Sequence, residues 1–337
     1  MAFWKKTTKA LLLCGVAVSA GVAAQAEDYP QGGTLHAAIS QMAPSPDPVV
    51  TTFGVNWMTA TIACEGLFAI DESWTPQPML ADSFEYSDDG KTLTVTLRPD
   101  LKFHSGAPVT SADVVASLNR YRDSAGIGAA LKNATASIEA VDDMTIRFNL
   151  NTPTAIVPGV IATAQAAIMS AKSLEDASAT QATTGLDCTG PYQLTSYQPD
   201  RGAVLTRWDD YQAREEPSSA FTGKKHAYAD EIDLMLMPEP SVRRDALLTG
   251  QIDIAYELPT DFYDALQADS GTEAVVVPNN QSLTAVFNTK QGPAADVNLR
   301  RAIYYALEMD PIMLASVGNP EFYTLDPSAF QCIQTCI

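Results

Sequence analysis

Histidine is scarce in this sequence, and its scarcity limits the metal chemistry that the chain supports. The 337 residues contain only His36, His104 and His226, and none lies within metal-ligand spacing of another histidine or of a cysteine. There is no HExxH and no CxxC, and the final "CIQTC" has the wrong spacing for a zinc or redox motif. We therefore expect neither a metal site nor a cofactor.

Signatures of nucleophilic catalysis are also absent. No GxSxG appears in the sequence, so the common hydrolase nucleophile has no counterpart. The pairs Asp88-Asp89 and Asp142-Asp143 have the composition used for acid–base work, but both stand at turn positions. His104, in "KFHSG", is best explained as stabilising its own loop. We expect that the protein is not an enzyme.

Positive charge is in short supply. Lysine and arginine total 21 against 40 acidic residues, which gives a formal net charge of −19. Such an excess of negative charge argues against a nucleic acid or an anionic membrane as partner. With 46% hydrophobic and 18% charged residues the chain is globular, and its length allows two or more domains.

One long apolar run exists, and it lies at the N-terminus. Residues 10–24 are apolar or small and follow three lysines, and "AQA" at 24–26 fits a signal-peptidase site. The run of 15 residues is shorter than the roughly 20 needed to span a bilayer. We expect residues 1–26 to be a signal peptide and Glu27 to begin the mature chain.

Strand signals are frequent after that segment. Leu93, Val95 and Leu97 alternate with threonines after an Asp-Asp-Gly turn, a pattern typical of a half-buried strand. Further strand or hairpin signals lie at 32–40, 139–153, 192–208, 230–237, 251–258, 272–278 and 282–288.

Helix signals alternate with the strands. Thr110 is a favourable N-cap for a helix over 109–123, and Asp113 suits the positive end of that helix. Other helical patterns lie at 58–66, 241–250, 260–268 and 296–311, and Asp310-Pro311 is expected to start one more. This alternation predicts an α/β fold.

The order of several motifs resembles a known family. They are "GGTL" (32–35), "EGLF" (65–68), residues 80–118, "TGPY" (189–192), "ALLTGQIDIA" (246–255) and residues 287–307. In this order they resemble the periplasmic substrate-binding proteins of peptide-type ABC transporters, solute-binding protein family 5. The resemblance covers residues 32 to about 320.

The resemblance implies a type II periplasmic-binding-protein-like α/β fold of the large cluster. Lobe I would comprise 27–64 and 185–275, with a β-rich subdomain inserted at 65–184. Members of the family are longer, so we expect 276–337 to be the start of an incomplete, truncated second lobe, and binding by this stretch alone to be weak.

The implied function is capture of peptides or peptide-like solutes outside the cytoplasm, by a monomer that delivers them to a membrane permease. By resemblance, an extended loop at 51–56 borders the ligand. The expected ligand-binding residues are Thr51, Thr52, Phe53, Gly54, Val55, Asn56, Trp57 and Asn288. The alternatives are a non-peptide solute, such as an opine, a sugar or a nickel chelate, and a non-functional remnant.

Export would place the remaining cysteines in an oxidising compartment. Cys188 stands where the family usually has glycine, just before "TGPY", and Cys64 lies in the other segment of the same implied domain. The two cysteines are expected to be either a disulfide or a pair of buried free thiols. No role is assigned to Cys332 and Cys336.

Overall fold

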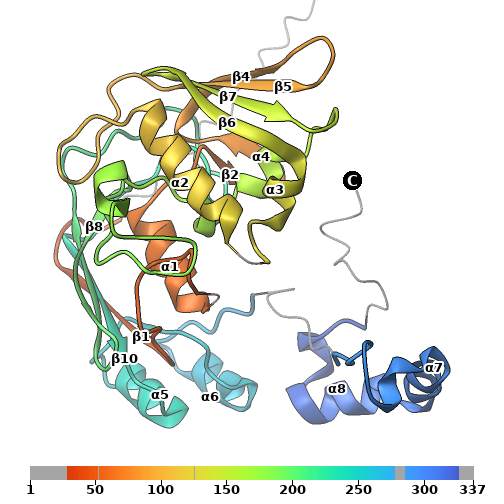
Figure 1. The fold of residues 1–337 in the computed structure, drawn as a ribbon. Coiled ribbons are helices and arrows are strands. Elements are labelled where there is room, and N and C mark those ends of the chain that lie inside the picture. The colour runs from red at the N-terminus through yellow and green to blue at the C-terminus, as the bar shows by residue number, and fades with distance from the viewer. Residues whose placement is uncertain (1–28, 52, 125, 278–284, 326–337) are drawn as a thin grey trace, which may run out of the picture. The chain divides into compact units, whose positions relative to one another are not determined.

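The computed structural model describes residues 29–51, 53–124, 126–277 and 285–325, and shows three sheets with helices packed on them (Figure 1). The expected signal peptide, Thr52, Cys332 and Cys336 lie outside these residues.

A five-stranded sheet joins the beginning of the chain to its later part. Its strand order is β11 (Ile254–Ala255), β1 (Thr34–Ile39), β10 (Glu231–Leu236), β9 (Gly202–Arg207) and β8 (Tyr192–Gln198). β1 runs parallel to both β10 and β11, whereas β9 is antiparallel to β10 and to β8. The first strand of the chain is thus paired with strands that follow residue 185.

The two faces of this sheet are covered by different helices, because alternate side chains of a strand point to opposite faces. Ala37 and Ile39 of β1 belong to the buried cluster that includes residues of α1 (Gly54–Ala63). Ala38 packs instead with Ala246 of α5 (Pro240–Leu248).

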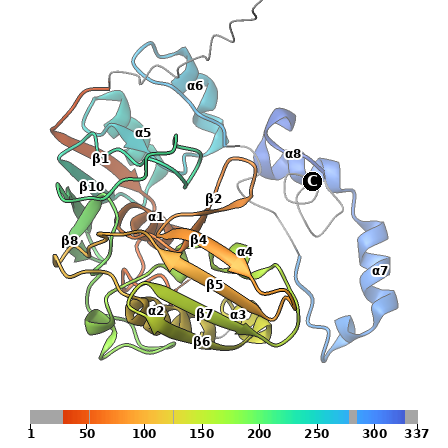
Figure 2. The same cartoon turned by 90° about the horizontal axis from the view of Figure 1, so that it is seen from above.

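A second sheet has four antiparallel strands. Its order is β4 (Ala81–Tyr86), β5 (Thr92–Leu97), β7 (Thr145–Leu150) and β6 (Thr135–Asp142). The helices α2 (Ser111–Asp123) and α3 (Ala129–Ala134) lie on one face of it, as both views show (Figures 1 and 2). A short pair, β2 (Phe68–Ile70) with β3 (Pro76–Pro78), and the helix α4 (Val157–Ile161) complete this part.

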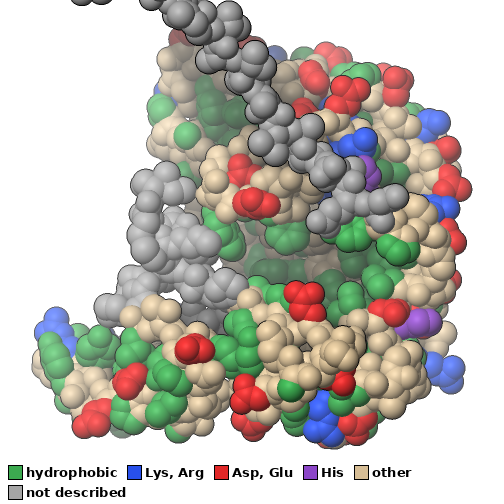
Figure 3. Space-filling view, turned by 180° about the vertical axis from the view of Figure 1, so that it is seen from behind, with side chains coloured by type: hydrophobic (Ala, Val, Ile, Leu, Met, Phe, Trp, Pro, Cys, Tyr) green, Lys and Arg blue, Asp and Glu red, His purple; other side chains and the backbone are tan. Residues whose placement is uncertain are grey.

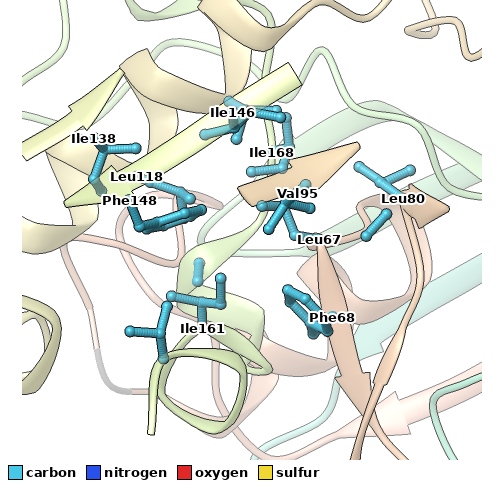
Figure 4. Packing of buried hydrophobic residues seen from close by; sticks show 14 of the residues in the cluster. Leu67, Phe68, Leu80, Val95, Leu118, Ile138, Ile146, Phe148, Ile161 and Ile168 are labelled. Atoms are coloured by element: carbon cyan, nitrogen blue, oxygen red, sulfur yellow. The ribbon is translucent and has the colours of Figure 1, made fainter. Parts of the chain in front are cut away.

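The core beneath the four-stranded sheet is separate from the core of the five-stranded sheet. Its buried members all fall between Leu67 and Ile168. Val95 of β5 and Phe148 of β7 belong to it, and Leu118 of α2 lies beside Phe148 (Figure 4). The alternating pattern of β5 is confirmed, since Leu93, Val95 and Leu97 are its buried residues.

The start of α2 follows the sequence prediction closely. Thr110 and Asp113 form a reciprocal capping box, in which the backbone N–H of Thr110 donates to Asp113 Oδ2 at 2.9 Å. This bond satisfies the backbone N–H of Thr110, and the backbone N–H of Ser111 donates to the carbonyl oxygen of Asp143 at 2.8 Å. Together they mark where the helix begins.

The last described part is helical. It contains α6 (Tyr263–Ala268), α7 (Val297–Ala306) and α8 (Met309–Val317), and Asp296 caps α7 by accepting from the backbone N–H of Asn298 at 2.8 Å. Short 3-10 turns occur at Ala164–Ala166, Ala171–Leu174, Thr260–Phe262, Pro293–Ala295 and Pro320–Phe322.

Several sequence predictions are wrong in detail. Residues 51–56 are not one extended loop, because α1 begins at Gly54 rather than near Met58. The strands expected at 272–278 and 282–288 are absent from the described residues 272–277 and 285–288, where no neighbouring strand supplies hydrogen bonds. The last helix begins at Met309, which places Asp310 inside its first turn.

Candidate functional site

A hollow opens where β1 and β11 end and α1 begins. The described residues that line it are Ile39, Ser40, Gln41, Gly54, Val55, Tyr256 and Glu257. Its volume of about 40 Å³ holds only a few atoms, so it forms part of a wall and does not enclose a ligand. The place is significant because ligands of open α/β sheets bind outside the carboxyl ends of the strands.

The strand ends are joined to each other across the hollow. Ser40 follows the last residue of β1, and its hydroxyl donates to Glu257 Oε2 at 2.7 Å. Glu257 lies two residues past β11 and has a φ of 55°, in the left-handed region that bulky residues rarely occupy. The residue is therefore held in place by its surroundings.

Arg243 of α5 supplies much of that support. Its side chain is fully buried, with 1% of the residue exposed. The guanidinium donates to the carbonyl oxygens of Met237 and Pro238, at 2.6 and 2.8 Å, and to the carbonyl oxygen of Glu257 at 2.9 Å. One buried cation thus ties the end of β10 to the end of β11.

The other side of the hollow is the first turn of α1. Gly54 and Val55 line the hollow, and the helix N-cap, Phe53, makes no side-chain capping bond. The first backbone N–H groups of a helix have no partner within the helix, so this end attracts acceptor atoms. Phe53 and Trp57, one turn apart, are 41% and 43% exposed beside it.

Three further expected ligand-binding residues, Thr51, Asn56 and Asn288, do not line the hollow and make hydrogen bonds within the chain. Asn56 is buried, and its side-chain amide donates to the carbonyl oxygen of Ser45. The hydroxyl of Thr51 accepts from the backbone N–H of Phe53 at 3.2 Å. Asn288 is not among the described residues that line the hollow, and its Oδ1 accepts from the backbone N–H groups of Lys290 and Gln291 at 3.0 and 3.2 Å.

Sequence reasoning missed five of the lining residues: Ile39, Ser40, Gln41, Tyr256 and Glu257. A signal for them was present, because they lie at or next to the carboxyl ends of the strands predicted at 32–40 and 251–258. Two parallel strands that are neighbours in one sheet bring such residues to the same edge.

A disulfide joins two segments within the core of the five-stranded sheet. Cys64, just after α1, is bonded to Cys188, and their Cα atoms are 4.8 Å apart. The backbone N–H of Gly190 donates to the carbonyl oxygen of Ala63 at 2.9 Å, and a Cβ on Gly190 would lie 2.6 Å from the Ala63 carbonyl carbon. The glycine is therefore required for the close approach of these two segments.

A buried carboxylate, that of Glu65, lies next to this disulfide. Glu65 accepts from the hydroxyl of Tyr211 at 2.7 Å and from that of Thr189 at 3.3 Å, and the Lys225 ammonium is 3.9 Å away. Burial raises the pKa of Tyr211 and lowers that of Lys225. The group is enclosed and paired, which indicates a structural role. Among the described residues no cluster of histidine, cysteine and carboxylate side chains is arranged to hold a metal ion.

The fold and the position of the hollow define a class. A mixed α/β sheet built from two distant segments, with a β-rich subdomain between them, is the architecture of type II periplasmic binding proteins. The profile of bacterial extracellular solute-binding proteins, family 5 Middle, matches residues 75–324. The chain belongs to family 5 of the bacterial extracellular solute-binding proteins.

Individual relatives agree with this assignment. A probable peptide ABC transporter periplasmic-binding protein, y4tO of Sinorhizobium fredii, is 30% identical over 289 residues, which cover 84% of this chain and 54% of the relative. The chain spans about half the length of the curated relatives it matches.

Solved structures show the same likeness. DppA of Helicobacter pylori, in complex with the peptide STSA, has a TM-score of 0.61 and 26% identity over 72% of this chain and 50% of that one. AgaA of A. tumefaciens, in complex with agropinic acid, has a TM-score of 0.62 and 26% identity over 71% and 46%. In the described part of the chain, no helix is both long and apolar enough to cross a membrane.

Proposed function

We propose that the protein is the extracytoplasmic solute-binding component of an ABC importer, which captures peptides or peptide-like solutes and delivers them to a membrane permease. The observation that carries the proposal is the hollow at the ends of β1 and β11, in a chain whose family is defined by solute binding. The names of y4tO and DppA support a peptide as the solute.

The wall of the hollow suits an extended peptide. Ser40 and Gln41 provide side-chain donors and acceptors, and the start of α1 provides backbone N–H groups. Peptide-binding sites commonly use such main-chain and polar contacts for affinity, while side chains enter wider pockets. Phe53 and Trp57 are exposed on the adjoining turn and offer apolar contact to a ligand side chain.

A non-peptide solute is the second candidate. AgaA, which is as similar to this chain as DppA is, was solved with agropinic acid. The hollow contains groups that bind amides, amines and carboxylates alike, so this alternative rests on a specific neighbour and on the same residues.

The remaining parts of the proposal rest on the signal-peptide pattern of residues 1–26 and on the family. The protein is exported and cut after Ala26, acts as a monomer in the periplasm and catalyses no reaction. Intact mass of the exported protein tests the cut, because the mature chain is expected to begin at Glu27; a soluble protein that keeps Met1 would contradict export.

Native mass spectrometry of the protein, isolated from cells without unfolding, tests the binding function and identifies the ligand class by mass. Gly54 and Gly159 both have open space where a Cβ would stand, and both lie in helices. Gly54→Tyr fills the hollow and is expected to remove the ligand, whereas Gly159→Tyr, on α4, is the matched control. A ligand retained equally by both variants would place the binding site elsewhere.

A further inference from the structure

The charge on the wall of the hollow is negative. Of the described residues that line it, Glu257 alone carries a charged side chain. Its carboxylate offers about four acceptor positions, and the Ser40 hydroxyl occupies one of them at 2.7 Å. The group is at the surface of the site and is available to a further donor.

The nearby cation does not neutralise this carboxylate by direct pairing. Arg243 donates to the main-chain oxygen of Glu257, and no ion pair within 4.0 Å joins the two side chains among the described residues. Arg243 therefore fixes the backbone of Glu257 and leaves its side chain directed by Ser40.

The backbone conformation of Glu257 is unusual for glutamate, which suggests a functional role for its side chain. Glycine or asparagine adopts a φ of 55° more readily than glutamate does, and four described non-glycine residues in this chain have a positive φ. A strained residue at a site wall is a reason to look for a role in that site.

The net charge of the whole chain is also negative and therefore also favours cationic solutes. The net charge is −19, and acidic side chains outnumber basic ones on the face shown in Figure 3. A field of this sign raises the local concentration of cations and lowers that of anions.

We propose that Glu257 is a specificity-determining residue, which makes the site prefer a solute that places a primary ammonium or guanidinium group against its carboxylate. The inference rests on the proposed function and refines it. The cation pairs with Glu257 while acceptor atoms of the same solute meet the N–H groups at the start of α1. A peptide amino terminus, an ammonium followed by a carbonyl oxygen, has this arrangement, and so does a lysine or arginine side chain next to a peptide bond.

Calorimetric titration of the full-length protein tests the proposal with three probes: trialanine, N-acetyl-trialanine and N-acetyl-Lys-Ala-Ala. We expect the unmodified protein to bind at least one cationic probe more tightly than the neutral acetylated peptide. If trialanine alone is preferred, the cation is the amino terminus; if the lysine peptide is preferred, it is the side chain.

Glu257→Gln keeps the size of the side chain and removes its charge. It is expected to lower the affinity for the preferred cationic probe roughly ten- to a hundredfold, as for loss of a hydrogen bond to a charged group. The affinity for the neutral acetylated peptide is expected to stay within about twofold of that of the unmodified protein. Glu257→Asn is the second variant. Asparagine tolerates the left-handed backbone, so this variant is expected to fold even if the glutamine variant does not.

The control is Glu85→Gln, which removes the same charge from an exposed position on β4. It is expected to change the affinity for each probe only by the amount that the loss of one unit of net charge explains. Binding of a cationic probe with equal affinity by the unmodified protein and both Glu257 variants overturns the specificity role and leaves peptide binding intact. If no probe binds to the unmodified protein, the peptide proposal and this inference are both wrong.

Discussion

Arg120 and Asp47 form an ion pair that is almost completely removed from water. The side chains are 5% and 0% exposed, and Arg120 Nη2 lies 2.6 Å from Asp47 Oδ2. Asp47 also accepts from the backbone N–H of Thr183 at 2.8 Å, and Arg120 Nε donates to the carbonyl oxygen of Ser178 at 2.8 Å. Because both groups are fully bonded, the pair holds together three separate segments of the chain.

Arg120→Met is therefore expected to lower the free energy of unfolding by about 3–5 kcal/mol, since it leaves the Asp47 carboxylate buried without its cation. Urea denaturation measures the change. Lys132→Met is the control: Lys132 pairs with Asp123 at 3.2 Å, but both side chains are more than half exposed, so about 1 kcal/mol or less is expected. Equal losses in the two variants would show that burial of the Arg120 pair does not matter.

His104 gives the protein a pH dependence of predictable sign. Its Nε2 is 3.0 Å from the carbonyl oxygen of Gly190, and its ring packs edge-on against Trp208 with centroids 5.0 Å apart. Burial lowers the pKa of His104 below its usual 6.5. The unfolded chain therefore takes up a proton at a higher pH than the folded protein does, and the stability present above pH 6.5 is lost as the pH falls.

Thermal unfolding at pH 7 and pH 5 tests this expectation. The unmodified protein is expected to be less stable at pH 5, with a contribution from this residue of at most about 1.4 kcal/mol per pH unit. His104→Gln keeps a side-chain donor near Gly190 and does not titrate, so its stability is expected to change less between the two pH values. An identical change in both proteins would assign the effect to other groups.

At the scale of elements, the bond between Cys64 and Cys188 joins the end of α1 to the segment that leads into β8. It spans 124 residues, and a link of that length restricts the unfolded chain strongly. The Cys64→Ala/Cys188→Ala variant is expected to lose about 2–5 kcal/mol of unfolding free energy.

Denaturation with and without dithiothreitol measures that loss. The reductant is expected to destabilise the unmodified protein and to leave the double variant unchanged. Non-reducing peptide mapping should recover the Cys64 and Cys188 peptides as one linked species. Free thiols at both positions in the folded, exported protein would contradict the bond.

Elements with a strong local pattern were the ones that the sequence predicted well. β5 could be recognised from alternating leucine, valine and threonine, and α2 from its capping box, because in both cases neighbouring residues determine the outcome. α1 was predicted to begin too late. Its first turn contains Gly54 and has no side-chain cap, so the helix start depends on packing of Val55 and on the buried amide of Asn56.

The candidate site could be predicted only in part, for a similar reason. Gly54 and Val55 were found because they lie in one stretch that resembles a family pattern. Ser40 and Glu257 are 217 positions apart, and only the pairing of β1 with β11 brings them together. No local pattern in a single sequence specifies which distant strands become neighbours.

At the scale of the whole molecule, burial is distributed unevenly. β5 and β7 are interior strands of a sheet with its own core, whereas α7 and α8 contain no buried residue. Leu307, between those helices, is 43% exposed, and hydrophobic side chains are visible over this part in the space-filling view (Figure 3).

Hydrogen exchange should follow this distribution, because local opening is easiest where few apolar contacts are broken. We expect amides of α7 and α8 to exchange before those of β5 and β7, measured by mass spectrometry on peptides from each element. Protection of α7 equal to that of β5 would mean that α7 is covered in solution by something that the described residues do not include.

The close approach of Cys64 and Cys188 has a consequence for protein engineering. The chain leaves the five-stranded sheet and returns to it at points whose Cα atoms are 4.8 Å apart, little more than the spacing of consecutive residues. The segment between residues 64 and 188 therefore begins and ends at neighbouring positions. A short turn spliced from residue 64 to residue 188 would restore chain continuity, and the excised stretch, circularly closed, carries its own sheet and core.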